Sequence, residues 1–201
     1  KDDPNVEKLS QLTARIAESA HRANQIIQRI RSMATKHEAE RVPVDIGNII
    51  SESLLFVRHD VETRSVDLSA IVPPGLPKVQ GDRILLQQVF VNLLVNAIQA
   101  IIPQDIEHRR VIVEAYEAGC EWIVVSVSDT GPGIPHEALP RLFDGFFTTR
   151  EGGMGMGLAI GQSLVDGHDG FISAANRPEG GAVFEVRLPV AAVTDECRPA
   201  A

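Results

Sequence analysis

The first part of the chain repeats apolar or small side chains at alternating intervals of three and four residues. Between Asn5 and Lys36 there is no proline and no glycine. The repeating positions are Val6, Leu9, Thr13, Ile16, Ala20, Ala23, Ile27, Ile30 and Ala34. This spacing is typical of the seam of a coiled coil or helix bundle. One such helix cannot bury its own apolar face, so we expect partner helices from a second chain or from residues outside this sequence. A surface helix lying on the domain that follows is the alternative.

The pattern changes after Lys36, where polar residues lead to Pro43. A polar stretch that ends at a proline is typical of a linker, because proline disfavours helix in the residue before it. We therefore place a long bundle helix with its linker at 1–41, a compact domain at 42–190 and a disordered tail at 191–201. The sequence begins without methionine and inside the predicted helix, so we expect it to be a piece of a longer protein.

Within the compact domain the pattern predicts helices and strands in mixed order. The predicted helices cover 46–63, 82–101 with Asp82 as its cap, a short stretch from 135, and 157–166. The predicted strands cover 66–72, 109–116, 122–128, 171–176 and 182–188. Because neighbouring strands are mixed with helices and do not repeat a β-α-β unit, we expect an α+β sandwich with helices on one face of the sheet.

Charge and hydropathy narrow the classes of partner. The chain carries 27 acidic against 19 basic residues, a formal net charge of −8, without a run of Lys and Arg. Because phosphate backbones are bound by clustered cations, we expect no nucleic-acid surface. The most apolar stretch, Val89–Ile102, is interrupted by three amides and is too short to span a bilayer. We therefore expect no membrane contact by this part of the protein.

The two cysteines, Cys120 and Cys197, lie far apart and belong to no Cys-x-x-Cys or Cys/His cluster. Neither a disulfide framework nor a zinc site is expected from this spacing. Such a chain suits a reducing compartment. We expect a cytoplasmic location, which leaves open whether a longer parent protein is tethered to a membrane.

Three amides recur at four-residue intervals on the predicted helix 82–101. They are Gln88, Asn92 and Asn96, and this spacing stacks them along one helix face. Amides among apolar neighbours are costly to bury without partners, so we expect them to line a polar cleft. An amide oxygen is a hard ligand that suits Mg²⁺ shared with substrate phosphates. Amides that satisfy nearby backbone groups are the alternative.

A second motif, Asp-Thr-Gly-Pro-Gly-Ile at Asp129–Ile134, directly follows a predicted strand. A carboxylate at a strand end can accept a hydrogen bond from an exocyclic amine. Gly131 and Gly133 would let the backbone approach a flat ring closely. The motif therefore suits the reading of a nucleobase, although the same residues are also typical of an ordinary tight turn.

Two further segments carry groups that can meet phosphate. The stretch Leu142–Arg150 contains three phenylalanines beside Thr148, Thr149 and Arg150, whose hydroxyls and guanidinium are phosphate donors. The stretch Gly153–Leu158 opens a predicted helix with alternating glycines, which expose backbone N–H groups at the positive end of the helix dipole. A hydrophobic plug and a flexible hinge are the respective alternatives.

In order and spacing, these four segments resemble the N, first glycine, F and second glycine boxes of sensor histidine kinases. The resemblance rests on Asn-Leu-Leu-Val-Asn-Ala ending at Ala97, Asp-Thr-Gly-Pro-Gly-Ile, Phe-Phe-Thr-Thr, and Gly-Met-Gly-Met-Gly-Leu followed by His-Asp-Gly at 168–170. It covers about residues 40–190, and its details are most similar to the nitrogen-regulation and oxygen-sensing subgroup. The bundle helix resembles the second stalk helix of such kinases.

The resemblance implies the Bergerat α/β sandwich shared with gyrase B, heat-shock-90 chaperones and the MutL repair ATPases. It implies that Asp129 binds the adenine amine of ATP, and that Asn96 ligates a Mg²⁺ ion bridging the phosphates. Residues 144–156 would form a lid over the nucleotide. The implied nucleotide-binding residues are Asn92, Asn96, Asp129, Gly131, Gly133, Ile134, Thr148, Thr149, Arg150, Gly153, Gly155, Met156, Gly157 and Leu158, with Asn96 also the metal ligand.

At some positions the residue differs from the one found in related proteins. Hydrolysing relatives carry a glutamate where Asn92 stands, and an amide cannot act as a general base, so phosphoryl transfer is favoured over rapid ATP hydrolysis. Many relatives carry Lys or Arg at Gln99 and Ser or Thr at Ala182, so contacts to phosphate or adenine are in doubt there. His168 ends the predicted helix 157–166, where a positive charge would suit the helix dipole.

The family implies transfer of the ATP γ-phosphoryl group to a stalk histidine and then to an aspartate of a response-regulator receiver domain. We expect this acceptor histidine to be absent from the sequence, so the catalytic set within it is empty. His37 begins a near match to the acceptor motif, but its proline is one place late and it lies in the linker. His21 lacks the acidic residue and the proline that should follow. The parent protein is expected to be a homodimer through its stalk helices.

Two other functions compete with this interpretation. A protein-serine kinase of the anti-sigma type shares the four boxes but lacks a stalk, so the bundle helix argues against it. A nucleotide-gated interaction module would bind ATP without transferring phosphate. A gyrase-like ATPase is disfavoured by Asn92 and by the acidic charge.

Overall fold

The computed structural model describes residues 41–101, 109–149 and 154–191. The chain divides into two units, 1–38 and 39–201, and all the described residues belong to the second. The predicted bundle helix and the predicted tail lie outside the described residues, so their boundaries stay predictions.

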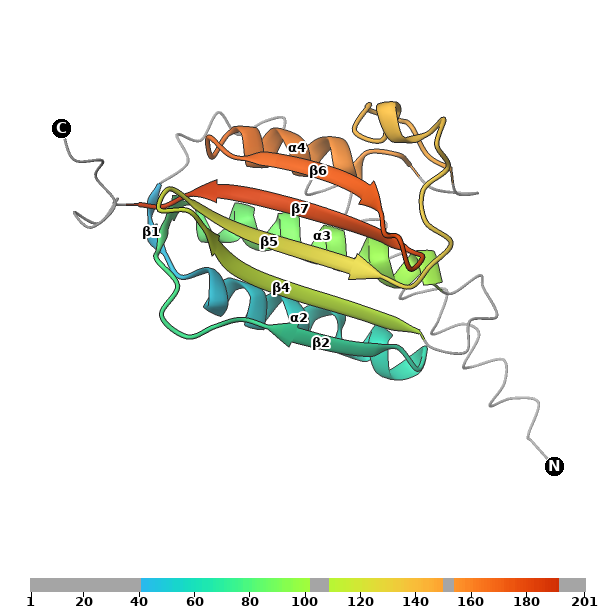
Figure 1. Ribbon diagram of the computed structural model, residues 1–201, viewed down its shortest axis with the longest axis horizontal. Helices are drawn as coiled ribbons and strands as arrows, with labels where there is room; N and C mark the ends of the chain where they lie inside the picture. Colours follow the sequence, from blue (N-terminus) through green and yellow to red (C-terminus); the bar gives the residue numbers. More distant parts are fainter. Residues whose placement is uncertain (1–40, 102–108, 150–153, 192–201) are drawn as a thin grey trace, which may run out of the picture. The chain divides into compact units, whose positions relative to one another are not determined.

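A five-stranded mixed sheet forms one layer of the second unit (Figure 1). In spatial order its strands are β2 (Asp67–Ile71), β4 (Arg110–Ala118), β5 (Trp122–Asp129), β7 (Ala182–Pro189) and β6 (Phe171–Asn176). The β2 and β4 strands pair in parallel, and the other neighbours are antiparallel. The register places Val111 of β4 opposite Asp129, so the end of β5 lies inside the sheet.

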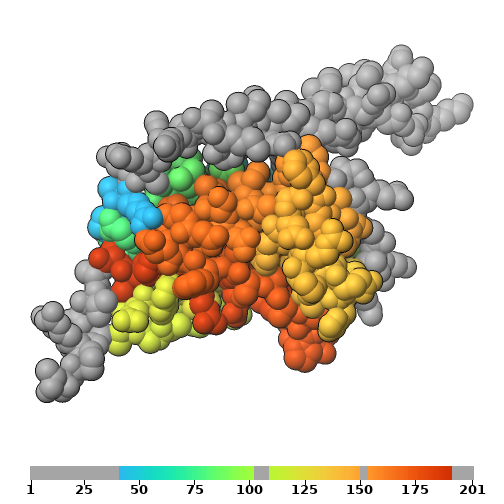
Figure 2. All heavy atoms as spheres, turned by 90° about the horizontal axis from the view of Figure 1, so that it is seen from above, coloured from blue at the N-terminus to red at the C-terminus, as the bar shows by residue number. Residues whose placement is uncertain are grey.

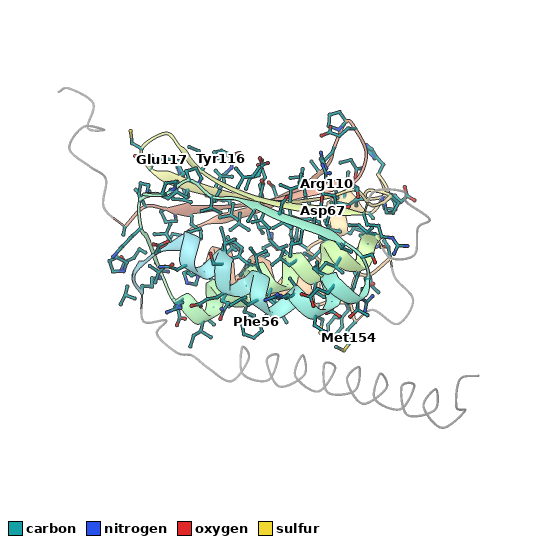
Figure 3. The ribbon with its side chains drawn as sticks, turned by 90° about the horizontal axis from the view of Figure 1, so that it is seen from below. Phe56, Asp67, Arg110, Tyr116, Glu117 and Met154 are labelled. Carbon is teal, nitrogen blue, oxygen red and sulfur yellow. The ribbon has the colours of Figure 1, made fainter. Side chains whose placement is uncertain are left out.

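Three helices cover one face of this sheet, as predicted. They are α2 (Ile46–Thr63), α3 (Arg83–Ile101) and α4 (Gly157–Asp166), and Figure 3 shows them below the strands as a second layer. Val111, Val113 and Ala115 alternate along β4 and are buried, as a strand with one covered face requires. The expected α+β sandwich with a mixed sheet and helices on one face is confirmed.

The helix starts follow from their caps. Asp82 Oδ1 accepts hydrogen bonds from the backbone N–H groups of Ile84 (2.9 Å) and Leu85 (3.2 Å), which confirms the predicted cap of α3. Asp45 Oδ1 accepts from Asn48 N (3.2 Å) and caps α2 in the same way.

The α3 helix is the core helix. By length and composition alone its 19 residues, with a mean hydropathy of 1.7, would pass for a membrane span. The fold accounts for this apolarity, because α3 packs against α2, α4 and the strands β4 and β5. Its fully buried side chains are Leu86, Val89, Phe90, Leu93, Leu94, Ala97, Ile98 and Ile101.

Two parts of the fold differ from the prediction. A second sheet pairs β1 (Val42–Val44) with β3 (Val79–Gly81), and each strand is too short to show a period. Pro43 lies within β1, which has a single neighbouring strand, so its missing N–H is tolerated there. The short helix predicted from residue 135 is only a 3₁₀ turn, η1, at Leu139–Arg141.

Cys120 lies in the turn between β4 and β5 and is disulfide-bonded, contrary to the expectation from spacing. The other cysteine, Cys197, lies outside the described residues.

The His-Asp-Gly motif at 168–170 ties α4 to the rest of the fold. His168 is only 1% exposed, its Nε2 accepts from the backbone N–H of Asp82 (2.9 Å), and its Nδ1 donates to the carbonyl of Leu164 (2.6 Å). Only the neutral ring can make both bonds, so the predicted role as a cation at the helix end is wrong. Gly170 is required by packing, because an added Cβ would overlap the carbonyl oxygen of Arg187.

We expect His168→Ala to lower the free energy of unfolding by about 2–4 kcal/mol, because a buried ring and two hydrogen bonds are lost together. Urea unfolding followed by circular dichroism measures the change. His136→Ala is the matched control, because that ring is exposed, and its effect should stay within about 0.5 kcal/mol. Equal effects of the two variants would contradict the role assigned to His168.

Candidate functional site

The amide row lies where the sequence places it, on one side of α3. Gln88, Asn92 and Asn96 are all half-buried. Asn92 faces the first residue of α4, since a Cβ added to Gly157 would lie 2.5 Å from Asn92 Oδ1. The glycine therefore gives the Asn92 amide room beside the start of α4. The amide row and the second glycine segment are brought together at this point.

The carboxylate of Asp129 is the second feature of the site. The residue is 1% exposed, and its Oδ1 accepts from the backbone N–H groups of Gly131 (2.7 Å) and Ala182 (3.4 Å). A buried carboxylate is costly without such donors, so the surrounding backbone is part of what keeps this group in the interior. The Asp129 side chain is thereby held in one orientation at the end of β5.

The loop after Asp129 packs against the far end of α3. A Cβ added to Gly131 would lie 3.3 Å from the Cβ of Ala100. Eight residues separate Asn92 from Ala100, which corresponds to about 12 Å along a helix. The α3 helix therefore forms a common wall, with the Asp129 loop at one end and the start of α4 about two turns away.

Two residues at the β6–β7 hairpin, which no sequence motif indicates, hold the same loop. The Asn176 side chain accepts from Ile134 N (2.6 Å) and donates to Ile134 O (2.7 Å). Gly133 has a φ of 78°, and its position leaves room for Asn176, whose Oδ1 would lie 2.7 Å from an added Cβ. The contact with Asn176 thus accounts for the glycine at position 133 and fixes the backbone of Ile134.

The second of these residues, Arg177, donates from Nη1 to the backbone carbonyl of Asp129 (3.2 Å) and from Nη2 to Glu179. The hydrogen bond from Arg177 holds the pKa of Glu179 below its usual value. Gly181 has a φ of 83°, and an added Cβ would overlap the carbonyl oxygen of Asp129. The Gly-Gly pair at 180–181 is a turn signal in the sequence, but its contact with Asp129 depends on the fold.

The phenylalanine segment lies next to Gly155 before α4, and Figure 2 shows the yellow-orange segment beside the orange start of α4 on one face. Phe146 is 69% exposed with a φ of 69°, whereas Phe147 lies under the Arg141 guanidinium at 4.6 Å. An added Cβ on Gly155 would overlap the backbone of both phenylalanines. Gly155 is therefore needed for packing inside the predicted lid.

The remaining predicted residues divide into two groups. Thr148 and Thr149 are exposed at the end of the phenylalanine segment, and Arg150 and Gly153 lie outside the described residues. Met156 and Leu158 are half-buried at the start of α4, where Met156 occupies the cap position without a side-chain cap hydrogen bond. The first turn of α4 therefore lacks a side-chain cap for its N–H groups.

The donor set restricts which metal could be held here. Among the described residues, no group of three or more His, Cys, Asp or Glu side chains could bind a metal ion. An amide such as Asn96 fits a Mg²⁺ ion that keeps most of its waters and takes other oxygens from a ligand. The residues present fit a shared Mg²⁺ and do not form a closed protein cage.

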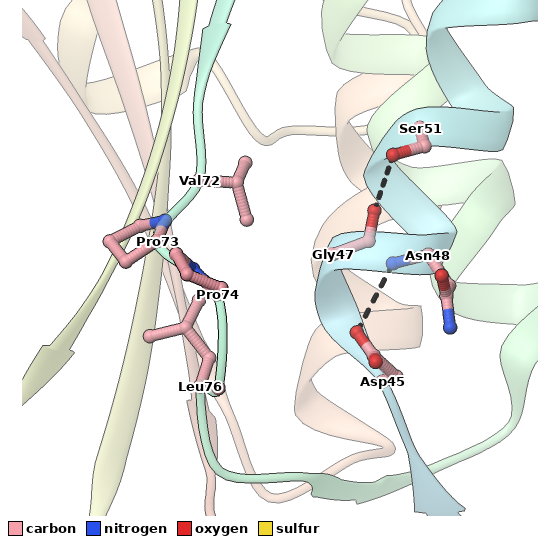
Figure 4. Close-up of a pocket in the computed structure, with 9 residues that line it drawn as sticks. Asp45, Gly47, Asn48, Ser51, Val72, Pro73, Pro74 and Leu76 are labelled. Atoms are coloured by element: carbon pink, nitrogen blue, oxygen red, sulfur yellow. Dashed lines mark hydrogen bonds between the residues drawn. The ribbon is translucent and has the colours of Figure 1, made fainter.

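A separate pocket of about 390 Å³ lies between the start of α2 and residues 72–76 (Figure 4). Its polar groups are engaged locally, since the Ser51 hydroxyl donates to Gly47 O (2.8 Å) and Asp45 caps α2. This pocket contains none of the predicted site residues. The candidate site is therefore formed by the end of β5, the start of α4 and the loop that precedes α4.

A family model described as "Histidine kinase-, DNA gyrase B-, and HSP90-like ATPase" matches residues 81–192, more than half of the chain. The chain belongs to this ATPase family. The match takes in α3, the Asp129 loop, α4 and the β6–β7 hairpin, which are the elements that build the site. The mixed sheet with helices on one face is accordingly the Bergerat sandwich that the motifs implied.

The chain is similar to Sensor protein FixL of Bradyrhizobium diazoefficiens, at 37% identity over 94% of this chain but only 37% of FixL. Among solved structures, full-length ShkA in complex with AMPPNP has a TM-score of 0.75 at 26% identity, covering 94% of this chain and 40% of ShkA. Histidine kinase ThkA in complex with response regulator protein TrrA has a TM-score of 0.73 at 27% identity, covering 98% of this chain and 55% of ThkA. The chain thus spans less than two fifths of the length of FixL.

The two glycines of α4 that face Asn92 give a matched test of this packing. We expect Gly161→Ala to raise the free energy of unfolding by about 0.5–1 kcal/mol, because alanine is the better helix former and its Cβ would be 3.8 Å from Asn92 Nδ2. Gly157→Ala should give no such gain, because its Cβ displaces the Asn92 amide. Urea unfolding of both variants measures this, and equal stabilisation by both would contradict the close approach.

Proposed function

We propose that this chain is the ATP-binding catalytic part of a two-component sensor histidine kinase. Its role is to bind ATP with Mg²⁺ and to present the γ-phosphoryl group to a stalk histidine, from which it passes to an aspartate of a response regulator. The parent protein acts as a homodimer through stalk helices, and this part of it works in the cytoplasm, away from the membrane and from nucleic acid. Membership of the ATPase family and similarity to FixL, ShkA and ThkA support this proposal.

The buried carboxylate of Asp129 is the observation on which the proposal depends. A fixed acceptor at a strand end suits the exocyclic amine of adenine, and the glycines beside it keep the approach to the ring open. The distance along α3 from this loop to the start of α4 suits the length of a nucleoside triphosphate.

At the other end, the first turn of α4 would receive the phosphates. Backbone N–H groups at Gly157 and Leu158 and the positive end of the helix dipole favour an anion there. Asn96, supported by Asn92 and Gln88, would hold the Mg²⁺ ion, which supplies charge neutralisation for the transferred group when bound. Thr148, Thr149, Arg150, Gly153 and Gly155 would belong to a lid that closes over the nucleotide.

The amide at Asn92 decides between transfer and hydrolysis. A general base must take a proton from the attacking water, and an amide has no such capacity. We therefore infer that bound ATP is hydrolysed slowly and that its γ-phosphoryl group is kept for an acceptor side chain.

A serine kinase is the second candidate function, because the same four segments would serve it. The two differ in the product: phosphohistidine is a phosphoramidate that acid hydrolyses, whereas phosphoserine survives acid. The bundle-like pattern of residues 5–36 favours the histidine kinase.

Replacing Asp129 tests the proposed adenine-binding site. We expect Asp129→Asn to keep the acceptor for Gly131 N but to weaken ATP binding by about 10-fold to 100-fold, because an amide group would replace the charged acceptor of the amine. Isothermal calorimetry with ATP and Mg²⁺ measures the loss. Glu62→Gln, which changes an exposed carboxylate of α2 paired with Arg58, should leave the affinity unchanged. Undiminished binding of ATP by Asp129→Asn would refute the proposed adenine-binding site.

Replacing Asn96 tests the metal site. We expect Asn96→Ala to weaken Mg²⁺-dependent binding of ATP by about tenfold while leaving adenosine binding intact, because the side chain would act only on the phosphates through the ion. Titrations with and without Mg²⁺ separate the Mg²⁺-dependent part of ATP binding from the part that the adenosine contributes. Gln87→Ala is the control, since this amide of α3 is engaged by Glu52. A loss that is the same without Mg²⁺ would argue against Asn96 as the ligand.

A further inference from the structure

The turn that joins β6 to β7 touches both ends of the Asp129–Ile134 segment. Residues 176–182 form this turn, which we call the hairpin turn, closed by hydrogen bonds from Arg177 N to Gly181 O (3.0 Å) and from Gly180 N to Arg177 O (3.1 Å). At the Asp129 end, the carbonyl oxygen of Asp129 receives the Arg177 guanidinium and lies against Gly181. At the other end, the Asn176 amide makes two hydrogen bonds to Ile134.

Each of these contacts acts on the backbone of the loop and leaves its side chains alone. Ile134 has both its N–H and its carbonyl engaged by one side chain, which fixes the peptide plane on each side of the residue. Gly181 carries no side chain because there is no space between it and the Asp129 carbonyl. Contacts with the hairpin turn therefore fix the backbone conformation at both ends of the loop.

The same turn also reaches the carboxylate itself. Ala182 N, the first residue of β7, donates to Asp129 Oδ1 at 3.4 Å, beside the shorter bond from Gly131 N. A rotation of the Asp129 backbone would move this oxygen away from both donors. The direction in which the carboxylate points thus depends on the hairpin turn as well as on β5.

We propose that Asn176 and Arg177 are positioning residues that set the selectivity of the site for the exocyclic amine of adenine. They act through the backbone of the loop that carries Asp129 and Ile134 and do not themselves touch the base. This inference rests on the proposed function, because it requires that Asp129 reads the amine.

The test compares two nucleotides that differ only at the amine. Purine riboside triphosphate lacks the exocyclic amine of ATP and is otherwise the same molecule. The ratio of the two dissociation constants therefore measures how well the carboxylate is aimed, and a general loss of folded protein leaves this ratio unchanged. Calorimetry with Mg²⁺ on the full chain gives both constants.

We expect the native chain to prefer ATP by about tenfold or more, as one hydrogen bond to a charged group allows. Asn176→Ala should bring the ratio of dissociation constants close to one. Asn176→Asp keeps the acceptor for Ile134 N but loses the donor to Ile134 O, and its ratio should fall between the two. Ser173→Ala, on the exposed part of the same strand, should keep the native ratio.

A second pair of variants covers the case in which Asn176→Ala does not fold. Arg177→Met removes the bond to the Asp129 carbonyl and should also lower the ratio. Glu179→Gln removes only the negative charge of the outer partner of Arg177 and should keep the native ratio.

The outcomes separate this inference from the proposed function. A native chain that binds both nucleotides equally, or binds neither, would refute the proposed reading of adenine by Asp129. A native preference for ATP that survives in Asn176→Ala and Arg177→Met would overturn the positioning role and leave the proposed function standing. A reduced ratio in these variants, with the native ratio kept in their controls, supports the inference.

Discussion

The burial of one carboxylate, that of Asp129, is the constraint on which the site depends. A charge that is 1% exposed must have its donors supplied by the fold, and here the backbone N–H groups of Gly131 and Ala182 supply them. This requirement brings the end of β5, the loop after it and the start of β7 together. Position 181 must then be a glycine, because nothing larger fits against the Asp129 carbonyl.

The α3 helix gives the site its length. One side of it is fully buried in the core, and on another side the half-buried Asn92 faces the start of α4. The helix is held at its first residues by the Asp82 cap, which His168 in turn engages from the end of α4. The two helices are thus tied together far from the ligand end, and Asn92 and Gly157 meet where the phosphates are proposed to lie. An apolar helix that would pass for a membrane span is in this fold a core helix with a row of half-buried amides on one side.

Elements with a clear period were predicted well from the sequence, and short ones were not. The helices α2, α3 and α4 and all five strands of the main sheet lie where the hydrophobic pattern places them, because each buries one face over several repeats. The pair β1 and β3 was missed, since three residues are too few for a period. The stretch from residue 135 was overestimated, because the turn residues and Pro140 allow only one 3₁₀ turn. The contacts of His168 could not be predicted, because its ring accepts a hydrogen bond from Asp82, 86 residues away.

By itself the sequence determined the periodic elements and the spacing of the amides on one helix face, because both follow from the geometry of a single element. It also determined the order of the four motifs, which was enough for the family. Only the tertiary structure decided what each motif residue contacts. Asn176 meets Ile134 and Gly181 meets Asp129 across more than 40 residues, because β7 pairs with β5 on one side and with β6 on the other and so brings these segments together. Such contacts have no local period, so no pattern along the chain could predict them.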